Sequence, residues 1–176
     1  MKWKGKLINY VIDQLKDDPE WENTIERILI DISVGIHLAV FNEPFLSLIF
    51  DGKKKIESRF SINKISPYEK IKEGDIVILK ESGGPVTGIF IVGEVKFFKQ
   101  LDKCLLAKIE DEFGELICAS YDKDFWTKRE RANYASLIEV NRIKKLPPFK
   151  SEKKDRSGWS ILRKTSLHRS LFDEKI

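Results

Sequence analysis

The apolar residues of the chain follow a helical spacing up to about residue 35 and a strand spacing after it. In the first part they recur every three or four residues, as they do on one face of a helix. These positions are Leu7, Ile8, Val11, Ile12 and Leu15, followed by Trp21, Ile25, Ile28, Leu29 and Ile32. Asp18 and Pro19 favour a helix start between the two groups, and Gly35 favours a helix end. We therefore expect a helical extension over residues 1–35, whose apolar stripe packs on the rest of the chain or on a protein partner.

Beyond residue 36, short apolar runs alternate with glycine-bearing turns. The pattern predicts strands at 37–41, 55–60, 76–79, 86–98, 134–146 and 159–162, and helices at 44–50, 101–113 and 124–132. Gly114 is expected to follow the second of these helices, and Pro147-Pro148 to end the fifth strand. Many strands with few helices indicate an α+β fold built on a closed or partly closed β-barrel. We expect the barrel to span residues 36–164 and a poorly ordered tail to follow at 165–176.

The composition is that of a globular protein, with 41% apolar and 34% charged residues. No apolar run approaches the roughly 20 residues that span a bilayer, and no apolar segment of a signal peptide follows the basic first six residues. Cys104 and Cys118 have neither the spacing of a disulfide framework nor that of metal ligands. We expect a cytoplasmic protein with no membrane contact, no metal and no cofactor.

The positive charge of the chain is concentrated toward its C-terminal end. The formal net charge is +4, yet residues 141–170 hold ten basic and two acidic side chains, whereas residues 1–35 hold five basic and seven acidic ones. Such a concentration attracts polyanions, nucleic acids among them. A solvated basic segment that only improves solubility explains the same excess, so charge alone leaves both interpretations open.

Residues 52–59 read Gly-Lys-Lys-Lys-Ile-Glu-Ser-Arg. They resemble the G-x-K-x-x-E-x-R signature of the ASCH family, with Gly52, Lys54, Glu57 and Arg59 at the signature positions. The context agrees, because an apolar strand and helix precede this run and a Gly-Asp turn and strand follow it. The segments 82–88 and 154–159 (Lys-Asp-Arg-Ser-Gly-Trp) are similar to one bacterial and archaeal branch of that family. The resemblance extends from about residue 37 to 163.

The resemblance implies a PUA-like β-barrel with peripheral helices and a cleft lined by the signature residues. It also implies recognition of RNA or of a modified nucleoside. One branch of the family consists of small amidohydrolases that cleave acetylcytidine with a lysine and a threonine of this motif. Lys54 corresponds to that lysine, but Glu57 occupies the threonine position, so the deacetylase activity does not carry over.

The chemistry of these residues agrees with a binding role. Glu57 and Arg59 lie two residues apart on a strand and so share one face, while Lys54 lies at the turn before it. A carboxylate can accept hydrogen bonds from the amino group of a base, and the two cations can bind phosphate or a carbonyl. Together they can contact the edge of an unstacked base. The alternative is a surface salt bridge, which contributes at most about 1 kcal/mol when exposed.

Four further polar residues are secondary candidates for ligand binding. Asn63 follows the signature strand and can hydrogen-bond a base, or can form a turn with its own backbone. Lys80 and Ser82 border the Gly83-Gly84 turn, which is either a phosphate site or a plain hairpin. Arg156 can bind phosphate or pair with its neighbour Asp155. Trp159 can stack on a base, but we expect it to fill the barrel.

Catalytic candidates are few. His37 opens an apolar strand and His168 lies in the tail, and neither has partners that the spacing of the sequence indicates. Glu94 can work with Glu57 only if the fold brings the two carboxylates together. A hydrolase acting on a modified base or on RNA therefore remains the alternative function, with Lys54 and Glu57 as its catalytic groups.

Overall fold

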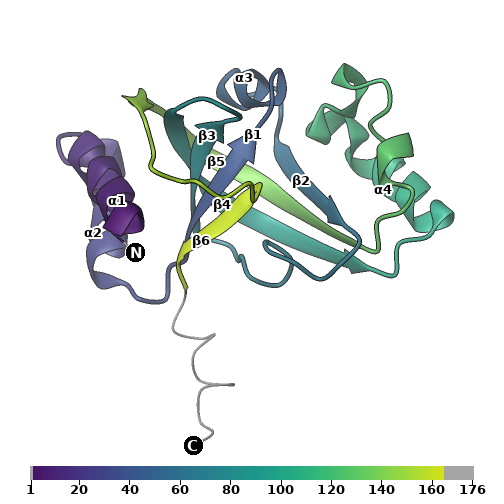
Figure 1. Ribbon diagram of the computed structural model, residues 1–176, viewed down its shortest axis with the longest axis horizontal. Helices are drawn as coiled ribbons and strands as arrows, with labels where there is room; N and C mark the ends of the chain where they lie inside the picture. Colours follow the sequence, from purple (N-terminus) through teal and green to yellow (C-terminus); the bar gives the residue numbers. More distant parts are fainter. Residues whose placement is uncertain (1, 165–176) are drawn as a thin grey trace, which may run out of the picture.

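The computed structural model describes residues 2–164 and has an α+β fold with one curled six-stranded sheet (Figure 1). The strands are β1 (Ile36–Phe41), β2 (Ile56–Ser61), β3 (Ile76–Glu81), β4 (Val86–Lys99), β5 (Tyr134–Phe149) and β6 (Trp159–Arg163). Their order across the sheet is β2-β5-β4-β3-β1-β6, with β1 and β3 parallel and the other pairs antiparallel. The curled sheet is a half-barrel, as the sequence predicts, and β2 and β6 are its two edges.

The helices cover opposite ends of this sheet (Figure 1). At one end lie α1 (Lys2–Leu15), the 3₁₀ turn η1 (Pro19–Trp21) and α2 (Glu22–Ile30). At the other end lie α4 (Lys103–Ile117) and the 3₁₀ turns η2 (Ala119–Tyr121) and η3 (Thr127–Arg129), while the short helix α3 (Phe45–Phe50) follows β1. None of the described helices is long and apolar enough to cross a membrane.

The helical extension packs on its own chain. Leu7, Val11 and Leu15 of α1 are buried in one apolar cluster with Ile36 of β1 and Ile89 of β4. Burying a side chain of this size stabilises the fold by about 1.5–3 kcal/mol. The stripe predicted from the sequence is therefore a structural element, and a protein partner bound through these helices remains only a prediction.

The end of that stripe differs from the prediction. The second helix ends at Ile30, not at Gly35, and Leu29 and Ile32 are exposed. Asp31 leaves the helical conformation and accepts a hydrogen bond from the Ser33 amide. This local side-chain bond offers the backbone an alternative to a further helical turn. Gly35 instead donates its amide to the buried Asp75 carboxylate.

Three other boundaries also differ from the sequence prediction. Helix α4 continues through Gly114 to Ile117, because Phe113 and Ile117 are buried against the sheet. The stretch 124–132 contains only the 3₁₀ turn η3 and no α-helix. Strand β5 continues through the two prolines, which fall in an irregular stretch between the Gly88–Lys145 and Val86–Phe149 pairs. Prolines are tolerated there because regular ladder hydrogen bonds are interrupted. The tail predicted at 165–176 lies outside the described residues.

Candidate functional site

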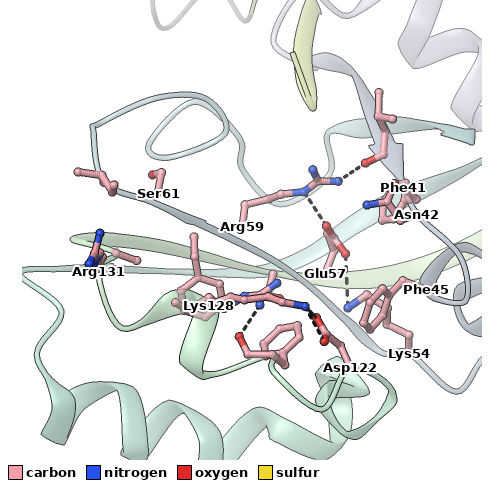
Figure 2. A pocket seen from close by; sticks show the side chains of 17 residues that line it. Phe41, Asn42, Phe45, Lys54, Glu57, Arg59, Ser61, Asp122, Lys128 and Arg131 are labelled. Carbon is pink, nitrogen blue, oxygen red and sulfur yellow. Dashed lines mark hydrogen bonds and ion pairs between the residues drawn. The ribbon is translucent and has the colours of Figure 1, made fainter. Parts of the chain in front are cut away.

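The signature residues lie where the two edges of the half-barrel face each other. Glu57 and Arg59 are on the edge strand β2, and Lys54 precedes that strand in the turn formed by Gly52, whose φ of 67° favours glycine. Figure 2 shows Glu57 between the Lys54 and Arg59 side chains. All three line a hollow of about 690 Å³, which we call the Glu57 hollow. The sequence-based hypothesis that these three groups converge is thus consistent with the geometry.

Lys54 is a buried cation, with only 2% of its surface exposed. Its Nζ donates to the backbone carbonyls of Ile56 and Ile117 at 2.8 Å each and lies 3.4 Å from Glu57 Oε2. Burial lowers the pKa of Lys54, because the charged form loses hydration, and the nearby Glu57 carboxylate partly opposes this shift. The side chain also lies over the Phe45 ring, at 5.3 Å from its centroid.

Glu57 is a buried carboxylate held between two cations. The residue is 4% exposed, and its Oε1 lies 2.6 Å from Arg59 Nε. Breaking a buried pair of this kind leaves an uncompensated charge, which costs about 3–5 kcal/mol. The exposed salt bridge considered from the sequence is therefore not what the structure contains.

Arg59 connects the two edges of the half-barrel. From β2 its guanidinium donates to the Val40 carbonyl in β1 at 2.9 Å and to the Gly158 carbonyl before β6 at 3.3 Å. The guanidinium carbon lies 5.1 Å from the Phe41 ring centroid and 5.2 Å from that of Trp159. Such cation–π contacts, with the two carbonyls, fix the direction of the side chain. Trp159 is buried, as expected, and its Nε1 donates to His37 Nδ1 at 3.2 Å.

A model of the ASCH domain matches residues 40–159 of the chain. The chain belongs to the ASCH domain family. Among solved structures, ASCH from Zymomonas mobilis is similar with 12% identity and a TM-score of 0.58, covering 76% of this chain and 90% of that one. A protein from Enterococcus faecalis V583 is similar with 11% identity and a TM-score of 0.47, covering 82% and 99%. A search of curated proteins finds no match. The first structure shows that the ASCH domain here has the PUA-like fold.

The opposite wall of the Glu57 hollow comes from the segment 122–132, which lies outside the signature motif. Arg129 lies over the Phe125 ring, 3.4 Å from its centroid, and burial lowers its pKa. Lys128 pairs with Asp122 at 2.8 Å, and Arg131 is exposed at the rim. The signal in the sequence that could have indicated this wall is a group of three cations within four residues, which begins two residues after the aromatic pair Phe125-Trp126.

Phe60 and Asn63 lie close to the signature residues in the sequence, but only Phe60 lines the hollow. Phe60 on β2 packs edge-on against Phe125 and also lines the hollow. Asn63 lies in the following loop, is exposed and does not line the hollow. Its role in ligand binding therefore remains a prediction without a contact to the other site residues.

The candidates near the second turn do not join the signature residues. Lys80 donates to the carbonyls of Glu81 and Gly84 at 2.9 and 2.7 Å, and so stabilises the hairpin. Burial, with a smaller contribution from the nearby Lys153, lowers the pKa of Lys80. Ser82 and Arg156 are exposed and line none of the hollows around the site. Asp155 pairs with Lys153 at 2.7 Å instead of with Arg156.

The other catalytic candidates are also separate from the hollow. His37 is buried, its Nε2 lies 3.1 Å from Asp75 Oδ2, and its Nδ1 accepts the hydrogen bond from Trp159. Glu94 is exposed, pairs with Lys96 at 2.6 Å and does not line the hollow that contains Glu57. His168 lies outside the described residues. Within residues 2–164 no group of histidine, cysteine or acidic side chains is arranged to hold a metal ion.

Proposed function

We propose that this ASCH domain recognises RNA or a modified nucleoside by accepting one base into the Glu57 hollow. The observation that supports the proposal is a buried carboxylate, fixed by two cations, that lines a hollow with aromatic and basic walls. The family is generally linked to RNA binding, which agrees with this chemistry. We also propose that the ASCH part covers residues 36–164 and that residues 1–35 form the helical extension.

Glu57 retains capacity for a ligand. A carboxylate has about four lone-pair sites, and Lys54 and Arg59 each approach one of its oxygens. The remaining sites can accept hydrogen bonds from the amino group or ring N–H of a base. Phe45 and Phe60 line the same hollow and offer apolar surfaces to a planar ring. Arg131 at the rim supplies a positive charge for a phosphate.

We also propose that the chain belongs to the ASCH branch that carries the 154–159 segment. In support, this segment contributes directly to the site. The Gly158 carbonyl accepts a hydrogen bond from Arg59, and the Trp159 ring lies beside the same guanidinium. The segment 154–159 is therefore in contact with a signature residue.

The alternative function, a hydrolase acting on a modified nucleobase or on RNA, depends on Lys54. A buried lysine with a lowered pKa is a better base than an exposed one at neutral pH. However, Lys54 Nζ already donates to two carbonyls and lies next to Glu57. Binding is therefore the function that this geometry favours, and product analysis separates the two.

The test is a binding titration of the whole chain with modified and unmodified nucleosides and with short RNAs. Glu57→Gln keeps the size of the side chain but removes its charge, and we expect it to weaken binding at least about tenfold. Glu94→Gln is the matched control, because Glu94 is exposed in an ion pair away from the hollow. RNA binding is expected to weaken with added salt. Equal affinities for Glu57→Gln and the wild type would contradict the proposal, and a mass-shifted product would favour the hydrolase.

A further inference from the structure

A second, smaller cavity adjoins the Glu57 hollow. It measures about 150 Å³ and shares Arg59, Phe60 and Ser61 with the hollow as lining residues. That volume equals the space of about five water molecules in the liquid, which suits a single planar ring. Its walls include the Tyr68 and Trp159 side chains. The two spaces are therefore neighbours along strand β2, separated by the fixed Arg59 side chain.

The cavity contains a buried hydroxyl group without a partner. Ser136 on β5 is 1% exposed, and within residues 2–164 its Oγ has no hydrogen-bond partner. In the sheet register Ser136 lies between Arg59 on β2 and Phe97 on β4. Leaving a buried hydroxyl without a hydrogen bond is unfavourable, and buried polar groups in natural proteins nearly always have a partner. Ser136 lines the cavity, so its hydroxyl can rotate and form a hydrogen bond with a polar atom of a ring that enters.

The cavity continues outward into a groove. The groove measures about 650 Å³ and shares Ile65, Tyr68 and Trp159 with the cavity. Lys64 and Lys70 line its outer part. The Glu57 hollow, the cavity and the groove thus follow one another, with basic side chains at both ends. Aromatic walls flanked by cations are the arrangement with which proteins hold single-stranded nucleic acids.

We propose that the ASCH domain binds a single-stranded RNA segment of at least two nucleotides, with one base in the Glu57 hollow and its neighbour in the Ser136 cavity. This inference rests on the proposed function and narrows its ligand from a free nucleoside to an RNA chain. Consecutive nucleotides are linked covalently, so the second base binds at a high effective concentration once the first is seated. The groove with Lys64 and Lys70 then receives the following phosphate.

The decisive experiment removes only the second base of the ligand. The probes are ribonucleoside 5′-monophosphates, ribodinucleotides with the same 5′-phosphate, and dinucleotides whose second nucleotide is abasic. The abasic probe keeps the charge of the complete dinucleotide, so electrostatic attraction is matched. Affinities are measured for the whole chain, for Ser136→Ala and for Thr87→Val. Thr87 also has a buried hydroxyl without a partner, but it lines neither the hollow nor the cavity.

We expect loss of the second base to weaken binding by at least about tenfold, which is about 1.4 kcal/mol. Ser136→Ala should reduce the ratio of the affinities for the complete and the abasic dinucleotide several-fold, and should leave the affinity for the monophosphates unchanged. Thr87→Val should change neither quantity. Ser157→Phe, at the exposed mouth of the cavity, should also reduce this ratio by blocking the entrance. Because the Ser157 hydroxyl is hydrogen-bonded to the Trp159 backbone, the free energy of unfolding of this variant is measured first. Equal affinities for the complete and abasic dinucleotides overturn this inference alone, as does an equal loss for all probes in Ser136→Ala. Failure of every probe to bind overturns this inference and also excludes unmodified RNA as the ligand of the Glu57 hollow.

Discussion

Two groups of charged and polar residues in this ASCH domain have similar sequence character but different surroundings. Lys54, Glu57 and Arg59 are largely buried, in mutual contact, and line one hollow. Lys80 instead donates to the carbonyls of its own hairpin, and Arg156 is exposed. The difference arises from position in the sheet. The first group lies at the junction between the edges of the half-barrel, whereas Lys80 lies at the end of a central strand.

Lys54, Glu57 and Arg59 contribute to the stability of the fold as well as to the hollow. Arg59 joins β2 to the Val40 and Gly158 carbonyls, so the signature residues stabilise the half-barrel as well as line the hollow. A substitution there changes stability and binding together. The free energy of unfolding of each variant is therefore measured first, and affinities are compared only among variants that remain folded.

The largest effect is expected for Glu57→Ala. Its removal leaves Lys54 and Arg59 without their carboxylate, and Lys54 stays buried with an uncompensated charge. We expect the free energy of unfolding to fall by about 3–5 kcal/mol, measured by urea denaturation. Glu94→Ala, in the exposed pair with Lys96, should cost less than about 1 kcal/mol. Similar losses for the two variants would show that the Glu57 cluster is not energetically distinct.

Arg59→Met is expected to have the second-largest effect. It removes the charged hydrogen bonds to Val40 and Gly158 and the ion pair with Glu57, while keeping much of the side-chain volume. Because Glu57 keeps its ion pair with Lys54, the loss is smaller than for Glu57→Ala. We expect a loss of about 2 kcal/mol in the free energy of unfolding. Because the Val40 amide donates to the Gly158 carbonyl at the same junction, its hydrogen exchange should accelerate more than that of amides in β4. Uniform acceleration across the sheet would contradict a local connecting role.

The convergence of the first group could be predicted only in part from the sequence. Alternation along a strand places Glu57 and Arg59 on one face, and the turn at Gly52 brings Lys54 beside them. The sequence contains no signal that Val40 and Gly158 meet at Arg59, because those contacts depend on which strands form the edges of the sheet. The cations and aromatic residues of the segment 122–132 indicate a basic surface there, but not that it faces the signature residues, because the sequence predicts a helix and a 3₁₀ turn forms.

The same limit explains the residues that did not join the site. Asn63, Ser82 and Arg156 have polar side chains near turns, which is why the sequence suggests them as ligand-binding residues, and all three are exposed. Turn chemistry is local and can be inferred from neighbouring residues. Whether two turns face the same hollow depends on the tertiary arrangement. Ser136 is the converse case: it lies in a mostly apolar strand, and only the sheet register reveals that it adjoins Arg59.

A smaller effect is expected in the pH dependence of stability. Burial lowers the pKa of Lys54 in the folded chain, whereas the unfolded chain keeps the ordinary value of 10.5. Between these two pKa values the unfolded chain binds more protons, so the contribution of Lys54 makes the free energy of unfolding rise with pH across this window. Below the lowered pKa the unfavourable burial of the charge is fully present.

Lys54→Met should remove this rise, by about 1.4 kcal/mol for each unit by which the pKa is lowered. The measurement is urea denaturation at stepped alkaline pH, with the difference between wild type and variant plotted against pH. Lys55→Met is the matched control, because Lys55 is adjacent but exposed. If the wild type and Lys54→Met have parallel curves, Lys54 does not carry a lowered pKa.

The smallest effect is expected for Arg156→Ala, and it completes the comparison between the two groups. Arg156 is exposed and lines none of the three connected spaces, so the free energy of unfolding should change by less than about 0.5 kcal/mol. If Arg156 contacts a phosphate outside these spaces, the variant should lower the salt dependence of RNA binding by about one unit of slope for every sequence alike. If the slope of RNA affinity against salt concentration is unchanged, the Arg156 charge is only solvated and contacts no phosphate. A loss of base preference would instead place Arg156 with the Glu57 group, because only side chains that reach a base edge discriminate between sequences.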